Sequence, residues 1–321
     1  MSTSAVKASS SLSAAWHGPP DLILQSPDGK QFRVHMKILS SVSSVFNGMV
    51  GLPQPTAEAD ALPTVAVAED SDTIQVLLDA LYPGRYPSTT LDLAALSKVA
   101  RAAEKYDMAC VMAFVAHCLQ SSRFEDEPLR IYAIAQRFGL RAIAADAAKA
   151  SLRHPWSMAL PPEFEELSAV AYHQLLLFRR RCEDVFDTQF DSESCRTYEE
   201  FTQFMSMLPT CSDCAQSSYG PLQKPIVHSR PSWFITHLHL AKQEFTQRVE
   251  GSTLMSPLLL NKTIRELRSG EPYARCGCAV LGPIKLMEFS QFYAAFLDRA
   301  LDKVYFDTDG VSEDSEDSEM D

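Results

Sequence analysis

The feature that most constrains the fold is an abrupt change of hydrophobic period near the N-terminus. Leu22–Leu24 form an apolar run that stops at Asp28-Gly29, and Phe32 and Val34 resume the apolar pattern on the far side. Asp-Gly between two such runs is a strong signal for a β-hairpin. After His35 the apolar residues recur at spacings of three and four, which predicts helix, at Ile38, Leu39, Val42, Val45 and Phe46.

The remaining pattern is mostly helical. Gly51–Pro63 contains three prolines and no periodicity, which indicates a surface loop, and Thr64–Val67 is a short strand candidate. The helix that follows could be capped by Ser71 or Asp72. Helices are expected at residues 74–81, 93–103, 108–119, 131–138, 141–152, 167–181, 201–208, 233–245, 258–267 and 289–301. The predicted fold class is α+β: short strands flanked by helices, followed by a mostly α-helical C-terminal domain.

A chain of 321 residues suits two hydrophobic cores, because one core usually serves about 100–200 residues. We expect a disordered N-terminal segment, a first domain, a helical pair, a mostly helical C-terminal domain and a disordered acidic tail. Their predicted bounds are residues 1–17, 18–121, 122–160, 161–306 and 307–321.

The net charge of −12 is concentrated at the C-terminus, since Asp307–Asp321 holds eight acidic residues and no Lys or Arg. The remaining charge of −4 is nearly balanced, and no stretch supplies the basic face that a duplex-binding protein needs. Direct nucleic-acid binding is therefore not expected. Ser312, Ser315 and Ser318 lie among the acidic residues and are candidate phosphorylation sites, whose added charge could tune binding to a basic partner.

No apolar run approaches the 18 or so residues that a spanning helix needs, and the N-terminus lacks the apolar core of a secretory signal. The chain is accordingly expected in the cytoplasm or nucleus, without a membrane partner. In that setting its eight cysteines are expected to be reduced thiols and not a disulfide framework.

The order of hairpin, two short helices, loop, strand and paired helices resembles the BTB/POZ fold over residues 18–121. The opening segment DLILQSPDGKQFRVHMKILSSVSSVF is similar to the signature of that family. The fold-signature residues are Asp21, Phe32, Val34 and His35, followed by Leu39, Ser43 and Phe46. Residues 125–152 resemble the helical pair after BTB domains in ubiquitin-ligase adaptors, and Tyr172–Cys182 is similar to segments of fungal BTB proteins.

This resemblance implies a protein-interaction module that binds itself or a partner. In part of the family the module is a substrate adaptor for a cullin-type ubiquitin ligase; the alternative is a transcriptional co-regulator that self-associates. Two positions depart from the family pattern: Met36 stands where repressors carry a basic residue, and Glu58 lacks a large apolar residue two positions before it. The expected interaction surface is the helical region from Leu39 together with the following loop, through Leu39, Ser43, Phe46, Met49 and Glu58.

Two cysteine pairs have spacings found in metal sites. Cys211-x-x-Cys214 and Cys276-x-Cys278 could supply four thiolates to a structural zinc ion, and reduced, partly buried thiols are the alternative. No other cofactor is expected.

The remaining polar candidates favour no catalytic site. His237 and His239 lie in a helical pattern, where two residues apart do not face one ligand. His35 is expected to make local hydrogen bonds, and Asp191 with Glu193, or Glu199 with Glu200, to be solvated. The chain has no phosphate-binding, dinucleotide-binding, zinc-protease or serine-hydrolase motif. A non-enzymatic protein is predicted, and an unrecognised site within residues 160–306 is the remote alternative.

Overall fold

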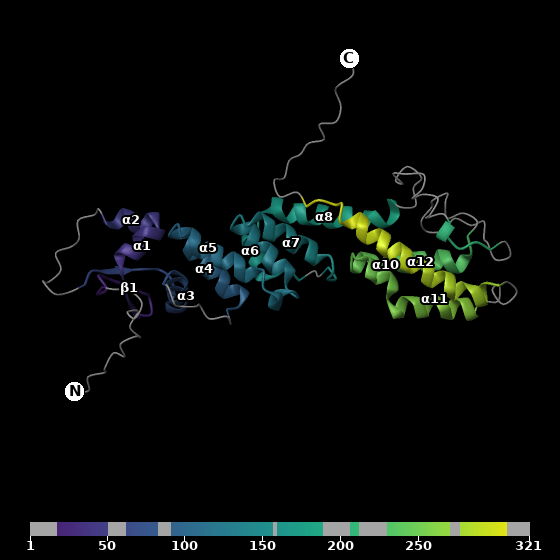
Figure 1. Ribbon diagram of the computed structural model, residues 1–321, viewed down its shortest axis with the longest axis horizontal. Coiled ribbons are helices and arrows are strands. Elements are labelled where there is room, and N and C mark those ends of the chain that lie inside the picture. Colours follow the sequence, from purple (N-terminus) through teal and green to yellow (C-terminus); the bar gives the residue numbers. More distant parts are fainter. Residues whose placement is uncertain are drawn as a thin grey trace, which may run out of the picture. The chain divides into compact units, whose positions relative to one another are not determined.

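The computed structural model describes residues 18–50, 62–82, 91–156, 159–188, 206–211, 230–269 and 277–306 (Figure 1). The chain divides into two compact units: unit 1 is residues 1–143 and unit 2 is residues 144–321. In the described ranges no helix has the length and apolar character needed to cross a membrane. The predicted α+β class is confirmed, with a small sheet and flanking helices followed by a helical region.

A three-stranded sheet in the order β2-β1-β3 lies at the N-terminal end of unit 1. The strands are β1 (Leu22–Gln25), β2 (Gln31–Val34) and β3 (Thr64–Ala66). The first two form the predicted antiparallel hairpin, in which Leu22 pairs with Val34, and β3 runs parallel to β1. Gly29 has a φ of +81°, which explains why the turn carries glycine. Alternate residues of the hairpin are buried on one face of the sheet.

Two short helices follow the hairpin, α1 (Met36–Val42) and α2 (Ser44–Val50). Ser43 separates them because its backbone is extended, with φ −139° and ψ 119°. Each helix is too short to be stable alone, so its stability comes from packing its apolar side into the core. Ile38 and Leu39 of α1 and Phe46 of α2 are those core residues.

Helices α3 (Ser71–Leu81), α4 (Leu93–Lys105) and α5 (Ala109–Leu119) complete the core of unit 1. The N-cap of α3 is Asp70, whose carboxylate accepts the Thr73 N–H at 2.8 Å, so the predicted cap at Ser71 or Asp72 was wrong by one or two residues. Asp92 caps α4 in the same way. The buried leucine, isoleucine and valine side chains of these helices carry the predicted helical period.

The boundary between the units falls inside the segment predicted as a helical pair. The short 3-10 turn η1 (Ser122–Phe124) and helix α6 (Pro128–Arg137) belong to unit 1, whereas most of α7 (Arg141–Ser151) belongs to unit 2. Pro128 begins α6, at a position whose backbone N–H would make no hydrogen bond within the helix, so the missing N–H of proline costs nothing there. Gly139, with a φ of +68°, follows the end of α6.

In its described residues, unit 2 continues with helices and short 3-10 turns. They are η2 (Pro162–Glu166), α8 (Ala169–Thr188), α10 (Ser232–Gln247), η4 (Gly251–Met255), α11 (Pro257–Ser269) and α12 (Cys278–Leu301). Helix α12 begins eleven residues before its predicted start at Phe289, because Pro283 lies inside the helix instead of ending it. The helix predicted at residues 201–208 lies largely outside the described residues.

A column of aromatic side chains forms the core of unit 2. Phe234 packs edge-on against Phe289 with ring centroids 4.8 Å apart, and Phe289 contacts Tyr293 at 5.3 Å. Phe186 contacts Tyr293 at 5.3 Å and Phe245 at 5.4 Å. The Tyr293 hydroxyl donates to the Phe186 carbonyl at 2.6 Å, which satisfies the polar end of a fully buried side chain. This column joins α8, α10 and α12.

A single buried arginine closes one end of that bundle. The guanidinium of Arg179, on α8, donates to the carbonyls of Thr246 and Gln247 at 3.0 and 3.2 Å. It also donates to the Ser151 and His154 carbonyls at 3.4 Å. One side chain therefore satisfies carbonyls at the C-terminal ends of both α7 and α10.

Candidate protein-interaction surface

The structure places most of the residues of the predicted interaction surface in the core of unit 1. Leu39, Ser43 and Phe46 are 0%, 3% and 1% exposed, so in this conformation they contact the core of the chain and not a partner. Met49 is half-buried, and Glu58 lies outside the described residues. The helical period identifies the apolar stripe of a helix, and here that stripe faces the protein's own core.

Asp21 has a local role that the sequence did not reveal. Its carboxylate Oδ1 accepts the backbone N–H of Met36, the first residue of α1, at 2.6 Å. His35, the N-cap residue of α1, offers no side-chain cap, so Asp21 supplies one from the strand side. Lys37, the next residue, is exposed. The acidic signature residue therefore holds the start of α1 against the sheet.

His35 connects three separate segments of unit 1. Its backbone N–H donates to the Tyr82 hydroxyl at 2.9 Å, and its ring Nδ1 lies 3.1 Å from the same oxygen. Its Nε2 lies 3.2 Å from the Gly18 carbonyl. Since Tyr82 follows α3 and is itself buried, His35 fixes the strand-to-helix junction to α3.

Ser43 and Phe46 connect α2 to the turn between α4 and α5. The Ser43 hydroxyl donates to the Tyr106 carbonyl and accepts the Phe46 N–H at 3.1 Å, so it caps α2 while anchoring it. The Phe46 ring stacks on Tyr106 with centroids 5.1 Å apart. Asp107, in a left-handed conformation with φ 52°, accepts from the Ser44 hydroxyl. These contacts explain the Ser-x-x-Phe spacing by packing alone.

The exposed side of this region belongs to other residues. On α2, Val45 and Val50 are 36% and 55% exposed, although both are large and apolar. Exposed apolar groups that recur on one short element mark a candidate contact surface. Val45 and Val50 are five positions apart, so they lie about 140° apart around α2, on either side of the buried Phe46. We call this exposed apolar rim, Val45 and Val50, the α2 face.

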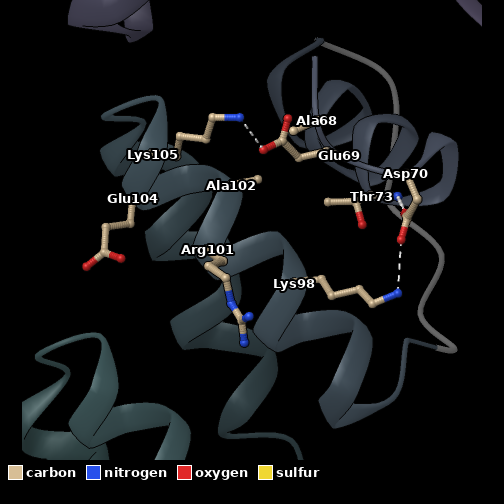
Figure 2. A pocket seen from close by; sticks show the side chains of 9 residues that line it. All are labelled: Ala68, Glu69, Asp70, Thr73, Lys98, Arg101, Ala102, Glu104 and Lys105. Carbon is tan, nitrogen blue, oxygen red and sulfur yellow. Dashed lines mark hydrogen bonds and ion pairs between the residues drawn. The ribbon is translucent and has the colours of Figure 1, made fainter. Parts of the chain in front are cut away.

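A groove of about 500 Å³ lies elsewhere on unit 1, between the start of α3 and one side of α4 (Figure 2). Its small lining residues, Ala68, Thr73 and Ala102, leave the space open. Charged residues make up the rest of the lining, namely Glu69, Asp70, Lys98, Arg101, Glu104 and Lys105. The size is within the range of ligand pockets, which runs from about 300 to 1,000 Å³.

All three acidic groups of the groove are paired, Glu104 with Arg137 at 3.0 Å. Glu69 accepts from Lys105 Nζ at 2.8 Å, and Asp70 accepts from Lys98 Nζ at 2.9 Å (Figure 2). Glu69 also accepts from the Tyr106 hydroxyl. Burial alone would raise the pKa of Glu69, but the hydrogen bonds from Lys105 and Tyr106 outweigh it and lower that pKa. Hydrogen bonds from Thr73, and then from Lys98, lower the pKa of Asp70 to about 2.

This arrangement suits structure or polar recognition better than acid–base catalysis. A general acid or base needs a pKa near the working pH, whereas both carboxylates are held ionised. Burial, followed by the hydrogen bond to Glu69, raises the pKa of the Tyr106 hydroxyl well above its ordinary value. The groove was not predicted from the sequence, although Lys98, Arg101 and Lys105 at i, i+3 and i+7 signal one charged helix side.

The candidate zinc site cannot be assembled from the described residues. Cys211 is half-buried and Cys278 is buried at the start of α12, while Cys214 and Cys276 lie outside the described residues. In the ranges that the structure describes, no group of three or more His, Cys, Asp or Glu side chains could hold a metal ion.

His237 and His239 are both in α10 and have different surroundings. His239 is exposed, whereas His237 is fully buried, with Nδ1 3.0 Å from Thr263 Oγ1 and Nε2 3.5 Å from Ser290 Oγ. Thr263 donates its own proton to the Leu259 carbonyl, so Nδ1 of His237 carries the hydrogen that Thr263 accepts. Burial lowers the pKa of His237 to about 4, and the ring is neutral at pH 7.

Comparison with known proteins identifies the family of unit 1. The model of the BTB/POZ domain matches residues 16–123, which extends two residues beyond the predicted domain at each end. No curated protein matches the chain. BTB/POZ domains are protein-interaction modules, and the match spans the hairpin, α1 to α5 and the contacts of Asp21, His35 and Ser43. Residues 16–123 are therefore a BTB/POZ domain.

Proposed function

We propose that the chain is an adaptor that joins two proteins, with the BTB/POZ domain binding a cullin-type scaffold of a ubiquitin ligase and unit 2 binding the substrate. Two observations support an adaptor: the BTB/POZ domain itself, and a second compact unit with its own aromatic core. Separate cores allow each unit to present a surface of its own.

The observation that carries the proposal is the α2 face. The side chains that first suggested a contact surface are buried, yet Val45 and Val50 remain exposed on the same helix. Burying apolar side chains against a partner is the main source of affinity in protein interfaces. Val50 directly precedes residues 51–63, the other predicted contact region, which contains Glu58.

The second candidate is a co-regulator that self-associates. The same exposed valines favour it, because an apolar face can bury itself against a second copy as readily as against a cullin. The two candidates differ in which protein covers the α2 face.

An enzymatic site in residues 160–306 receives less support. The most enzyme-like cluster in the described part of that range is His237 with Ser290 and Thr263, since a histidine beside a hydroxyl can activate a nucleophile. All three side chains are fully buried, so no substrate reaches them in this conformation. Their geometry favours a structural role.

Titration of the full chain with a purified cullin N-terminal region tests the proposal. We expect binding by the wild type, and loss of at least about tenfold in affinity for a Val45→Glu, Val50→Glu variant, since a buried unpaired charge costs several kcal/mol. Val170→Glu is the matched control, because Val170 is 63% exposed on α8 of unit 2.

Light scattering of the same proteins separates the two candidates. If the wild type binds no cullin and has the mass of a dimer, and the Val45→Glu, Val50→Glu variant has the mass of a monomer, the chain is the self-associating co-regulator. A chain that binds no cullin and keeps one mass in every variant refutes both uses of the α2 face.

A further inference from the structure

Four exposed basic residues gather at one end of unit 2. Lys149 and Arg153 lie at the C-terminal end of α7, and Arg180 and Arg181 lie on α8. The two helices meet here, since the guanidinium of Arg179, the residue before Arg180, donates to the carbonyls of Ser151 and His154, two positions after Lys149 and one after Arg153. We call Lys149, Arg153, Arg180 and Arg181 the basic patch.

The charges of the basic patch are not neutralised by the surrounding described residues. Among the residues that the structure describes, none of the four has an ion-pair partner. Three acidic residues lie within one helical turn of them: Glu183, which is paired with Arg179, and the exposed Asp146 and Asp184. The four positive charges thus face two acidic residues not engaged by Arg179, which leaves a surplus of two.

The pKa of Cys182 supports this closeness. Burial raises the pKa of its thiol to about 12, and the charges of both Arg181 and Lys149 oppose that shift. The thiol is thus within electrostatic range of α7 as well as of its own helix.

The described chain ends beside this patch. The ring of Phe306 packs edge-on against Phe178 of α8 with centroids 5.2 Å apart, and Arg181 follows Phe178 by one turn. The next fifteen residues, 307–321, lie outside the described residues and contain eight acidic and no basic side chains. Fifteen residues can span up to about 50 Å, so every residue of the patch is within their reach.

We propose that the basic patch on α7 and α8 is a binding site for an acidic peptide, and that its occupant is the chain's own C-terminal segment, residues 307–321. The charge complementarity carries the choice: the most acidic segment of the sequence starts at the residue after the one that packs on α8. Attachment also raises the effective concentration of the segment at the patch to the millimolar range, by an order-of-magnitude estimate. This inference does not depend on the cullin proposal.

A labelled synthetic peptide of residues 307–321 is the probe, titrated into the full chain at low salt. We expect weak binding to the wild type, because its own segment competes. In a full-chain variant with the eight tail Asp and Glu residues changed to Asn and Gln, we expect binding at least about tenfold tighter. The same peptide with phosphate on Ser312, Ser315 and Ser318 should bind more tightly still, and salt should weaken both.

A second substitution set locates the site. Changing all four patch residues to Gln in the neutral-tail chain should weaken peptide binding by about tenfold or more, since four exposed charge contacts are lost. The control removes four exposed charges elsewhere, through Lys37→Gln, Lys262→Gln, Arg268→Gln and Lys285→Gln. Equal binding by the patch variant and the control overturns the proposal. So does tighter binding of a duplex DNA probe than of the peptide, which would assign the patch to phosphate-rich partners.

Discussion

Replacing Arg179 with methionine should lower the free energy of unfolding of unit 2 far more than the same substitution at Arg180 or Arg181. Its side chain is only 6% exposed, forms an ion pair with Glu183 at 3.0 Å and donates to four carbonyls. Methionine keeps the apolar stem but leaves those carbonyls and the Glu183 carboxylate without their donor. Two of the contacts, at 3.0 and 3.2 Å, have good hydrogen-bond lengths, and a charged hydrogen bond contributes about 1.5–3 kcal/mol. The expected loss is about 3–5 kcal/mol, similar to breaking a buried ion pair.

Urea unfolding followed by tryptophan fluorescence measures that loss in the correct unit. Of the three tryptophans, Trp156 and Trp233 are in unit 2, and Trp233 is 1% exposed. For a slope of about 2 kcal/mol per molar urea, a loss of about 4 kcal/mol lowers the midpoint by about 2 M. Arg179→Lys should lie between wild type and Arg179→Met, because an ammonium keeps the charge but cannot form the planar fork.

The sequence supplies its own controls for this experiment, since Arg180 and Arg181 directly follow and are exposed. Arg180→Met and Arg181→Met should change the free energy of unfolding by no more than about 0.5 kcal/mol. A free energy of unfolding for Arg179→Met within about 1 kcal/mol of those of the two control variants would refute the assigned role of Arg179. That margin allows for the error of mutational comparisons.

Three further substitutions test other parts of the structure. Phe46→Ala should destabilise unit 1 by about 3–5 kcal/mol in thermal or urea unfolding because it leaves a cavity, whereas Val45→Ala should cost less than about 1 kcal/mol; equal losses would contradict the burial of Phe46. The pKa of His237 is about 4 in the folded chain against an ordinary 6.5, so as the pH falls the unfolded chain takes up the proton first. The contribution of the neutral ring to the free energy of unfolding is therefore complete above pH 6.5, and about 3 kcal/mol of it is lost as the pH drops to 4. His237→Asn should flatten that part of the pH profile of unfolding, and an unchanged slope would argue against a neutral buried ring. Gly251→Ala should lower the thermal midpoint of unit 2 strongly, because a Cβ would lie 2.2 Å from the Ala294 carbonyl oxygen, while Gly277→Ala meets nothing within 4 Å and should not.

The local pattern was enough to predict the elements of unit 1. The Asp-Gly turn between apolar runs fixed the hairpin, and the shift to a period of three and four located α1 and α2. Both signals depend on residues close in sequence. The resemblance carried by Asp21, Phe32, Val34 and His35 then pointed to the family that the comparison identified.

The contacts between distant residues could not be predicted in this way. Nothing near Asp21 in sequence shows that it caps α1, and nothing near Ser43 shows that it reaches the Tyr106 carbonyl, 63 residues away. The same limit explains why Leu39 and Phe46 were assigned to a surface: periodicity shows that one side of a helix is apolar, but not whether the chain or a partner covers it. In unit 2, Arg179 was one arginine in a run of three, and only the structure distinguishes it from Arg180 and Arg181.

Quantitative affinity capture from the native cell, followed by mass spectrometry, tests most directly the claim that the BTB/POZ domain presents the α2 face to a protein. The full wild-type chain is compared with its Val45→Glu, Val50→Glu variant and with the Val170→Glu control, all three checked for equal stability. The account predicts that a cullin or additional copies of the chain are captured by the wild type and the control and lost from the double variant. The same captured proteins in equal amounts from all three would contradict it.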